Sequence, residues 1–279
     1  MAEVDTTLHS TVKELKRLGS KCGHGISVAA GCDIFVKFVT RKNLEKDHIK
    51  TALKAMRERG NAFAEISSRS RAKIASLGRQ FIRDEMTILC HGFSRVVLAL
   101  LVEASKTTRF SVILTEGRPE NEASAMFAKR LCEDAKVPVR MILDSAAGYV
   151  MDKVDMVLLG AEAVVENGGI VNKIGTNGLT IIAKAYTTPV YVACESYKFS
   201  RIFPLSQTDI PLSQEALKRA RVNDSELKAR DFKSLSKCNV PVLNPLVDYT
   251  PPEFITFLLT DLGVFTPSAV SDELIKLHQ

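Results

Sequence analysis

Five short apolar runs in the middle of the chain limit its fold more than any other sequence feature. They occupy residues 87–90, 110–114, 139–143, 156–159 and 190–193, and helical stretches separate most of them. Apolar strands that alternate with helices form a parallel sheet that is buried on both faces. We therefore predict an α/β fold with a Rossmann-like, doubly wound parallel sheet.

The first 85 residues have a helical spacing instead. Apolar residues recur three or four positions apart in three segments, which end near Gly19, Gly60 and Arg83. Asp5 is a candidate cap for the first segment, and glycine commonly follows the end of a helix. The sequence thus predicts an N-terminal helical domain at residues 1–85, followed by the Rossmann-like domain at residues 86–279.

Polar side chains follow each predicted strand. Parallel sheets bind ligands outside the carboxyl ends of their strands, and basic and amide side chains there are suited to phosphate, while carboxylates accept hydrogen bonds from sugar hydroxyls. Each residue also has a structural alternative, since it could pair with a neighbouring carboxylate or cap a loop. The predicted ligand-binding residues are Ser94, Arg95, Glu116, Arg118, Glu162, Asn172 and Lys173.

Residues 158–176 form the densest polar stretch. Four glycines, two acids and two asparagines lie between an apolar strand and Thr176, which we predict to cap a helix. A glycine-rich loop before a helix N-terminus favours anions, because its N–H groups approach a ligand and the helix dipole is positive there. We predict a long loop that binds a phosphorylated small molecule. The alternative is a simple connection.

Beyond the fifth strand, the sequence predicts two helices and an insertion. Residues 206–239 are polar and charged and read as a surface insertion with a short helix. Thr250-Pro-Pro-Glu253 matches a capping box, which predicts a helix over residues 254–262. Thr266-Pro-Ser268 predicts the start of a last helix.

The net charge of +6 allows an acidic partner, and much of it lies early in the chain. Seven basic residues and two acids fall between residues 57 and 83. Such a run is often a solvated helix face, but it could also bind an acidic or phosphorylated protein. Few aromatic residues are present here to stack on bases, so we expect no direct nucleic-acid binding. The candidate partner-binding residues are Arg69, Arg71, Lys73 and Arg79.

The six cysteines are scattered without a Cys-x-x-Cys pair, so we expect reduced thiols, no metal site and no cofactor. Acids stand where a signal peptide would be basic, and the apolar run 96–102 is too short to span a bilayer. We expect no membrane association and a cytosolic location.

Several motifs closely resemble the initiation factor 2B alpha/beta/delta family. The resemblance covers nearly the whole chain, and its carboxy-terminal segment resembles the alpha branch in particular. The amino terminus looks a few helical turns shorter than that of the family. The motifs are His91-Gly-Phe-Ser-Arg95, Thr115-Glu-Gly-Arg-Pro119, the glycine-rich segment 160–169, Asn172-Lys-Ile-Gly-Thr176 and the segment 262–275.

This resemblance implies a regulatory subunit of the guanine nucleotide exchange factor for translation initiation factor 2. Such subunits form homodimers that join two copies of the beta, gamma, delta and epsilon subunits. They help the complex sense phosphorylation of the alpha subunit of initiation factor 2, and their helical domain meets that partner. A pocket for a phosphorylated metabolite is compatible with this role.

The same superfamily contains a rival function, the isomerisation of ribose 1,5-bisphosphate or methylthioribose 1-phosphate. Those relatives resemble this chain but carry a cysteine after the first sheet strand and an aspartate after the fourth. Here the cysteine position is Gly92 and the aspartate position is Glu162. Cys90 lies two residues early, roughly 7 Å along an extended strand, and we predict that it packs in the core. The resemblance therefore implies no catalytic residues.

Overall fold

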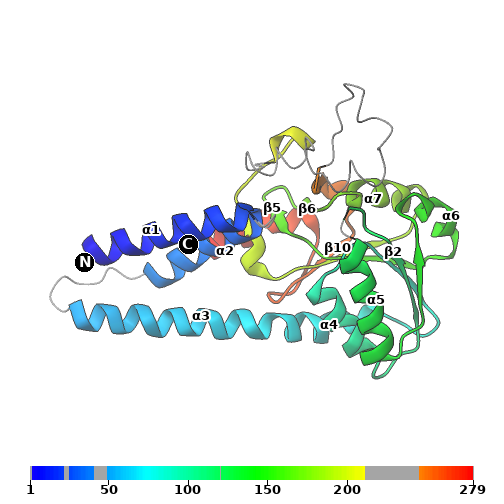
Figure 1. Ribbon diagram of the computed structural model, residues 1–279, viewed down its shortest axis with the longest axis horizontal. Helices are drawn as coiled ribbons and strands as arrows, with labels where there is room; N and C mark the ends of the chain where they lie inside the picture. Colours follow the sequence, from blue (N-terminus) through cyan, green and yellow to red (C-terminus); the bar gives the residue numbers. More distant parts are fainter. Residues whose placement is uncertain (1, 22–24, 41–48, 120, 211–244, 279) are drawn as a thin grey trace, which may run out of the picture.

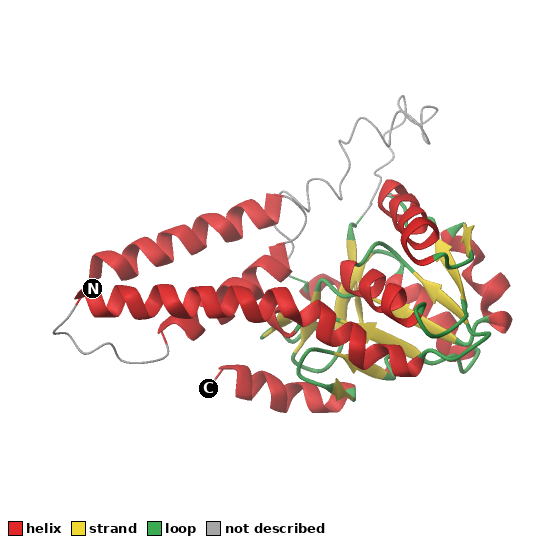
Figure 2. Ribbon diagram, turned by 90° about the horizontal axis from the view of Figure 1, so that it is seen from below, coloured by secondary structure: helices red, strands yellow, loops and turns green. Residues whose placement is uncertain are grey.

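The computed structural model describes residues 2–21, 25–40, 49–119, 121–210 and 245–278. Three helices come first, α1 (Ala2–Lys21), α2 (Gly25–Thr40) and α3 (Ile49–Gly78). They pack in sequence order and project from the part of the molecule that contains the sheets (Figure 1). Figure 2, turned by 90°, shows the strands gathered at the other end between helices.

The helix boundaries correct three predictions that rested on glycine and on a cap. Helix α1 starts before Asp5 and continues past Gly19, where an added Cβ would lie 2.7 Å from Val28 Cβ. Helix α3 runs through Gly60, which lies beside the ring of Phe35. A glycine inside a helix costs only about 1 kcal/mol. Close packing against α2 therefore outweighs the local signal at both positions.

The main sheet has seven strands in the order β11-β10-β7-β4-β1-β2-β3, and only β11 is antiparallel to its neighbour. The five predicted strands are all confirmed, with shifts of one residue at some ends. This order is that of a Rossmann-like, doubly wound sheet. The strands are β1 (Thr87–Cys90), β2 (Ser111–Thr115), β3 (Val139–Ile142), β4 (Met156–Leu159), β7 (Val190–Ala193), β10 (Phe257–Leu259) and β11 (Val264–Phe265).

Strand β10 replaces the helix predicted over residues 254–262, so that prediction was wrong. The capping pattern produces only the short 3-10 helix η7 (Pro252–Phe254). Leu258 and Leu259 are buried, and β10 pairs with β7 in the sheet. Burial of this apolar run between β7 and β11 outweighs the local helix-start signal.

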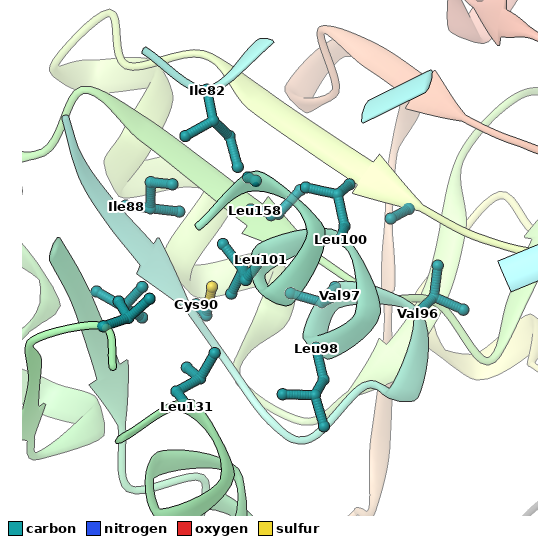
Figure 3. Close-up of a cluster of buried hydrophobic side chains, with 14 of the residues drawn as sticks. Ile82, Ile88, Cys90, Val96, Val97, Leu98, Leu100, Leu101, Leu131 and Leu158 are labelled. Carbon is teal, nitrogen blue, oxygen red and sulfur yellow. The ribbon is translucent and has the colours of Figure 1, made fainter. Parts of the chain in front are cut away.

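Helices cover both faces of the sheet and bury two apolar clusters. Helices α4 (Arg95–Ala104) and α5 (Asn121–Ala135) pack on one face, and Figure 3 shows α4 side chains meeting Ile88 and Leu158 of the sheet. Helices α6 (Ala147–Val150), α7 (Thr176–Ala185) and α10 (Val270–His278) cover the other. Helix α10 begins near the predicted Thr266 start, after η8 (Pro267–Ala269). Within the described ranges, the other 3-10 helices are η1 (Arg79–Phe81), η2 (Asp144–Ala146), η3 (Met151–Lys153), η4 (Ser196–Lys198) and η5 (Gln207–Asp209).

A second sheet occupies the stretch predicted as a long loop. Residues 158–176 contain the end of β4, then β5 (Ala163–Val165) and β6 (Ile170–Lys173), which form an antiparallel hairpin. With β8 (Phe199–Ser200) and β9 (Val247–Thr250) they make the sheet β8-β5-β6-β9. Asn167-Gly168-Gly169 between two apolar runs is a hairpin signal. The loop prediction was therefore wrong.

The proposed division into residues 1–85 and 86–279 falls in the turn between η1 and β1. Ile74 and Ala75 of α3 belong to the apolar cluster that α4 forms with the main sheet, so the end of α3 packs in the core of the sheet domain. Of the predicted insertion, residues 211–239 lie outside the described residues. No helix in the described ranges is long and apolar enough to cross a membrane.

Candidate functional site

The strand order places the crevice of the main sheet between β1 and β4. From β1 the chain proceeds to β2 and β3 on one side, whereas β4, β7 and β10 lie on the other. Ligands of doubly wound sheets bind at this switch in direction. The loops after β1 and β4 touch here, since an added Cβ at Gly160 would lie 2.5 Å from Ser94 Oγ. Ser94 Oγ also accepts a hydrogen bond from Val97 N at 3.4 Å and so caps α4. Arg95, the first residue of α4, is exposed.

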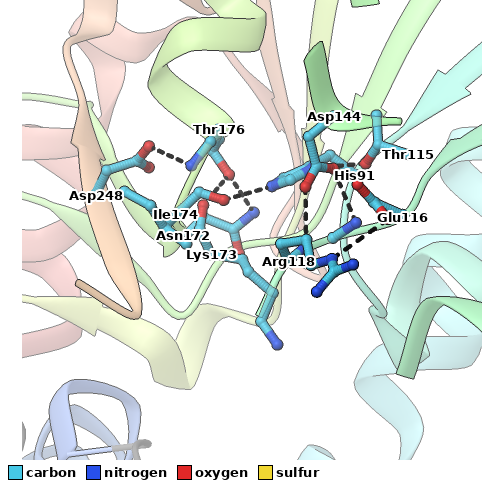
Figure 4. Close-up of polar contacts among 12 residues, drawn as sticks. His91, Thr115, Glu116, Arg118, Asp144, Asn172, Lys173, Ile174, Thr176 and Asp248 are labelled. Carbon is cyan, nitrogen blue, oxygen red and sulfur yellow. Dashed lines mark hydrogen bonds and ion pairs between the residues drawn. The ribbon is translucent and has the colours of Figure 1, made fainter. Parts of the chain in front are cut away.

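His91 ties three segments together beside this crevice (Figure 4). Its Nδ1 lies 2.6 Å from Thr115 Oγ1, and its Nε2 lies 2.8 Å from the Ile174 carbonyl oxygen. Burial lowers the pKa of His91, so the ring is neutral at physiological pH. Because a carbonyl only accepts, Nε2 carries the proton and Nδ1 accepts from the Thr115 hydroxyl. The ring therefore fixes the ends of β1 and β2 against the turn before α7.

Asp144 fixes the loop after β2. Its two carboxylate oxygens accept hydrogen bonds from the backbone N–H groups of Gly117 and Arg118, each at 2.8 Å. The Arg118 side chain is exposed, and its Nε lies 3.4 Å from Glu116 Oε2. Glu116 and Arg118 thus stand together at the open end of the site.

The residues before α7 complete this group. Asn172 is buried and donates from Nδ2 to Thr176 Oγ1 at 3.1 Å, and that hydroxyl donates to the Lys173 carbonyl at 2.6 Å. The Lys173 stem passes Gly92, where an added Cβ would lie 3.2 Å from Lys173 Cδ. Figure 4 shows the Lys173 and Arg118 side chains extending in the same direction. The structure therefore brings together four of the seven predicted ligand residues, Glu116, Arg118, Asn172 and Lys173.

The helix N-terminus predicted to bind an anion already holds one from the protein. Asp248 Oδ2 accepts from Gly175 N at 2.8 Å and from Asn177 N at 3.1 Å. The cap position is Gly175, at φ 99°, and not Thr176 as predicted. Burial raises the pKa of Asp248 to about 6, although the two backbone N–H donors act in the opposite direction. Because Asp248 occupies these N–H groups, the basic groups near the crevice that could bind a ligand anion are the side chains of Arg118 and Lys173.

A second polar cluster joins the helices to the sheet. Glu195, which follows β7, is buried; Arg71 Nε of α3 lies 3.5 Å from its Oε1, and Lys198 Nζ lies 3.2 Å from its Oε2. Ser27 of α2 donates to Glu162 Oε2 at 3.0 Å. Glu162, the remaining predicted ligand residue, thus contacts the helical layer.

The four candidate partner-binding residues do not share one surface. Arg71 faces the sheet, as its contact with Glu195 shows. Arg69 pairs with Glu65 on the exposed side of α3, and Lys73 lies one turn further along the same face. Arg79 is exposed in η1. Arg69 and Lys73 are the pair that can act together on a partner.

Sequence reasoning missed Thr115, Ser27 and Asp248 as members of these clusters. Asp248 is the charged residue of the mostly buried strand Val-Asp-Tyr-Thr, and a carboxylate in a buried strand is the signal that could have identified it. Ser27 has no comparable signal, because its role depends on how α2 packs. Among the described residues, no group of three His, Cys, Asp or Glu side chains could hold a metal ion.

Strand order and site together define an α/β protein of the Rossmann-like class, with a polar, partly basic site at the strand ends and a helical layer packed beside it. A family model described as the initiation factor 2 subunit family matches residues 2–267. The chain belongs to this family.

The relatives include both initiation factor subunits and isomerases. A translation initiation factor eIF2B subunit alpha from Dictyostelium discoideum is 47% identical over 277 residues, which cover 97% of this chain and 83% of the relative. A ribose 1,5-bisphosphate isomerase from Haloferax volcanii is 34% identical over 203 residues, which cover 72% of this chain and 59% of the isomerase. A chain of the tetrameric eIF2B-beta2-delta2 complex from C. thermophilum shares the fold, with a TM-score of 0.65 at 20% identity over 97% of this chain and 95% of that chain.

Proposed function

We propose that the chain is the alpha-type regulatory subunit of the guanine nucleotide exchange factor for translation initiation factor 2. The observation that carries this proposal is the 47% identity to an eIF2B alpha subunit across 97% of the chain. At this identity over nearly the whole chain, the relative is expected to have the same fold. The resemblance of segment 262–275 to the alpha branch supports the same assignment.

Within this proposal the chain is not an enzyme. The isomerase cysteine position is Gly92, which has φ 70°, a backbone conformation that side chains other than glycine rarely adopt. Cys90 is buried in the core, as the sequence predicted, and burial raises the pKa of its thiol. A thiol that stays protonated away from solvent is a poor acid, base or nucleophile at neutral pH. The similarity to an isomerase is the observation in favour of the alternative function, sugar-phosphate isomerisation. An assay for turnover of ribose 1,5-bisphosphate tests it.

We also propose that Glu116, Arg118, Asn172 and Lys173 retain a site for a phosphorylated metabolite. Arg118 and Lys173 would bind the phosphate by charge-assisted hydrogen bonds, and Glu116 would accept from a hydroxyl. The Asp248 carboxylate at the start of α7 directs the phosphate toward these side chains, because a second anion beside it would be repelled.

The proposed partners are a second copy of the chain, the beta, gamma, delta and epsilon subunits, and initiation factor 2 with its phosphorylated alpha subunit, all in the cytosol. Arg69 and Lys73 on the exposed face of α3 are the proposed contacts with the phosphorylated factor. The Arg71–Glu195 contact would hold α3 in place for this interaction.

Reconstitution tests the proposal. Purified chain is added to the beta, gamma, delta and epsilon subunits, and nucleotide exchange on initiation factor 2 is measured with and without the phosphorylated inhibitor. We expect a larger complex and a stronger inhibition by the phosphorylated factor when the chain is present. Exchange that responds identically with and without the chain contradicts the proposal.

A further inference from the structure

A cavity of about 460 Å³ opens at the amino ends of β2 and β3, at the opposite end of the strands from the candidate site. Its walls come from the turn before β1, the loop between α4 and β2, and the turn between α5 and β3. Small-molecule pockets commonly measure about 300 to 1,000 Å³. The cavity therefore has the size for a small ligand and is too small for a folded partner.

The lining of this cavity carries two cations and one carboxylate, that of Glu85. Arg109 and Lys136 both line it and are exposed, and neither forms an ion pair within the described ranges. The carbonyls at the end of α4 do not need them, since Leu101 O accepts from Ser105 N at 2.9 Å and Ala104 O accepts from Thr108 N at 3.0 Å. Both positive charges are thus available to a ligand.

The walls that carry these cations are held by backbone contacts. Arg109 N donates to Asp84 Oδ1 at 2.7 Å, and Glu85 N donates to Arg109 O at 2.7 Å. Val137 N, directly after Lys136, donates to Leu131 O at 3.3 Å. A cavity with fixed walls spends little free energy on ordering when a ligand binds.

The remaining walls restrict the ligand further. Phe110 and Val137 are buried and line the apolar part of the cavity. Glu85 places a carboxylate in the wall, which disfavours a second anionic group on the ligand. The lining therefore fits one phosphate and one flat apolar group, and does not fit a sugar bisphosphate.

We propose that this cavity binds a small phosphate monoester that carries a flat apolar group. The phosphate contacts Arg109 and Lys136, and the apolar group lies against Phe110 and Val137. This site is independent of the proposed metabolite site at the carboxyl ends of the strands. It requires neither Arg118 nor Lys173.

The probe is phenyl phosphate, which has one phosphate and one flat ring. Titration calorimetry on the full chain should give a Kd at least tenfold lower for phenyl phosphate than for inorganic phosphate, because the ring adds burial against Phe110. Hydrogen exchange with bound phenyl phosphate should slow in peptides spanning residues 83–87, 105–111 and 135–139. Equal affinity for both probes, or protection confined to residues 91–95 and 115–118, overturns the proposal.

Matched variants provide a second test. Arg109→Gln with Lys136→Asn should raise the Kd for phenyl phosphate at least tenfold; asparagine suits the φ of 55° at this position. Arg130→Gln with Lys129→Asn removes the same charge from α5 outside the cavity and should change the Kd less than twofold. An unchanged Kd in the first variant, or an equal rise in both, refutes the site.

Discussion

Replacing the Asp248 carboxyl by an amide should make the folded protein more stable at neutral pH. Burial raises the pKa of Asp248 from 3.8 to about 6, so the folded state binds this proton more tightly than the unfolded state does. The stabilisation that the proton provides is complete below about pH 4 and is lost as pH rises through about 6. At pH 7.5 the ionised carboxylate therefore costs stability.

The pKa difference sets the size of the effect. About two pKa units correspond to about 3 kcal/mol, which is an upper limit. An asparagine oxygen can still accept from Gly175 N and Asn177 N, but these bonds lose their charge assistance, at a cost of about 1 kcal/mol. The amide N–H₂ would replace Asp248 Oδ1, a buried carboxylate oxygen that has no hydrogen-bond partner among the described residues. We expect Asp248→Asn to raise the free energy of unfolding by about 1 to 2 kcal/mol at pH 7.5.

Urea denaturation from pH 4.5 to 8 measures this effect. The parent should lose stability between pH 4.5 and 7 relative to Asp248→Asn, and the two curves should converge at the acid end. Asp209→Asn is the control with the opposite sign, because backbone and Ser206 hydrogen bonds lower the pKa of that exposed carboxyl. A variant less stable than the parent at pH 7.5, or a constant difference across the range, would refute the reasoning.

Three further outcomes are expected. Glu195→Gln should reduce the free energy of unfolding, measured by urea denaturation, by about 3 kcal/mol, because Arg71 and Lys198 lose their buried counter-charge. A change below about 0.5 kcal/mol contradicts this. Ribose 5-phosphate should raise the melting temperature of the parent by preferential binding to the folded state, and Arg118→Ala with Lys173→Ala should abolish the rise. Charge reversal of Arg69 and Lys73 should leave assembly intact and weaken inhibition of exchange by phosphorylated initiation factor 2, whereas unchanged inhibition would mean that this face is only solvated.

Five strands of the main sheet were predictable because each is a short, mostly apolar run. Strands β1, β2, β4 and β7 are mostly buried, whereas β3 lies at the sheet edge and is partly exposed. Strand β10 was not predictable, since Thr250-Pro-Pro-Glu253 carries a strong local helix signal and only the pairing with β7 overrides it. The hairpin of β5 and β6 had a turn signal in Asn167-Gly168-Gly169, which the glycine-rich loop interpretation concealed.

The sequence was enough to predict which strand ends carry the polar groups of the candidate site. Their partners were not predictable, because contacts such as Arg71 with Glu195 join residues more than a hundred positions apart. Arg71 looked like a surface charge because it lies in a stretch rich in basic residues. Only the packing of α3 on the sheet shows that it faces inward.

Helix α3 has the geometry of a lever arm, because it is long and is held at one end. Its last turns are fixed in the core through Ile74 and Ala75, and Arg71 lies just before that anchor. From Ile49 to the anchor the helix extends about 35 to 40 Å, at about 1.5 Å per residue. A rotation of about 5° at the anchor therefore displaces the far end by about 3 Å, a geometric consequence of that length. A small tilt at the fixed end would thus become a displacement of several ångströms at the far end of the helix.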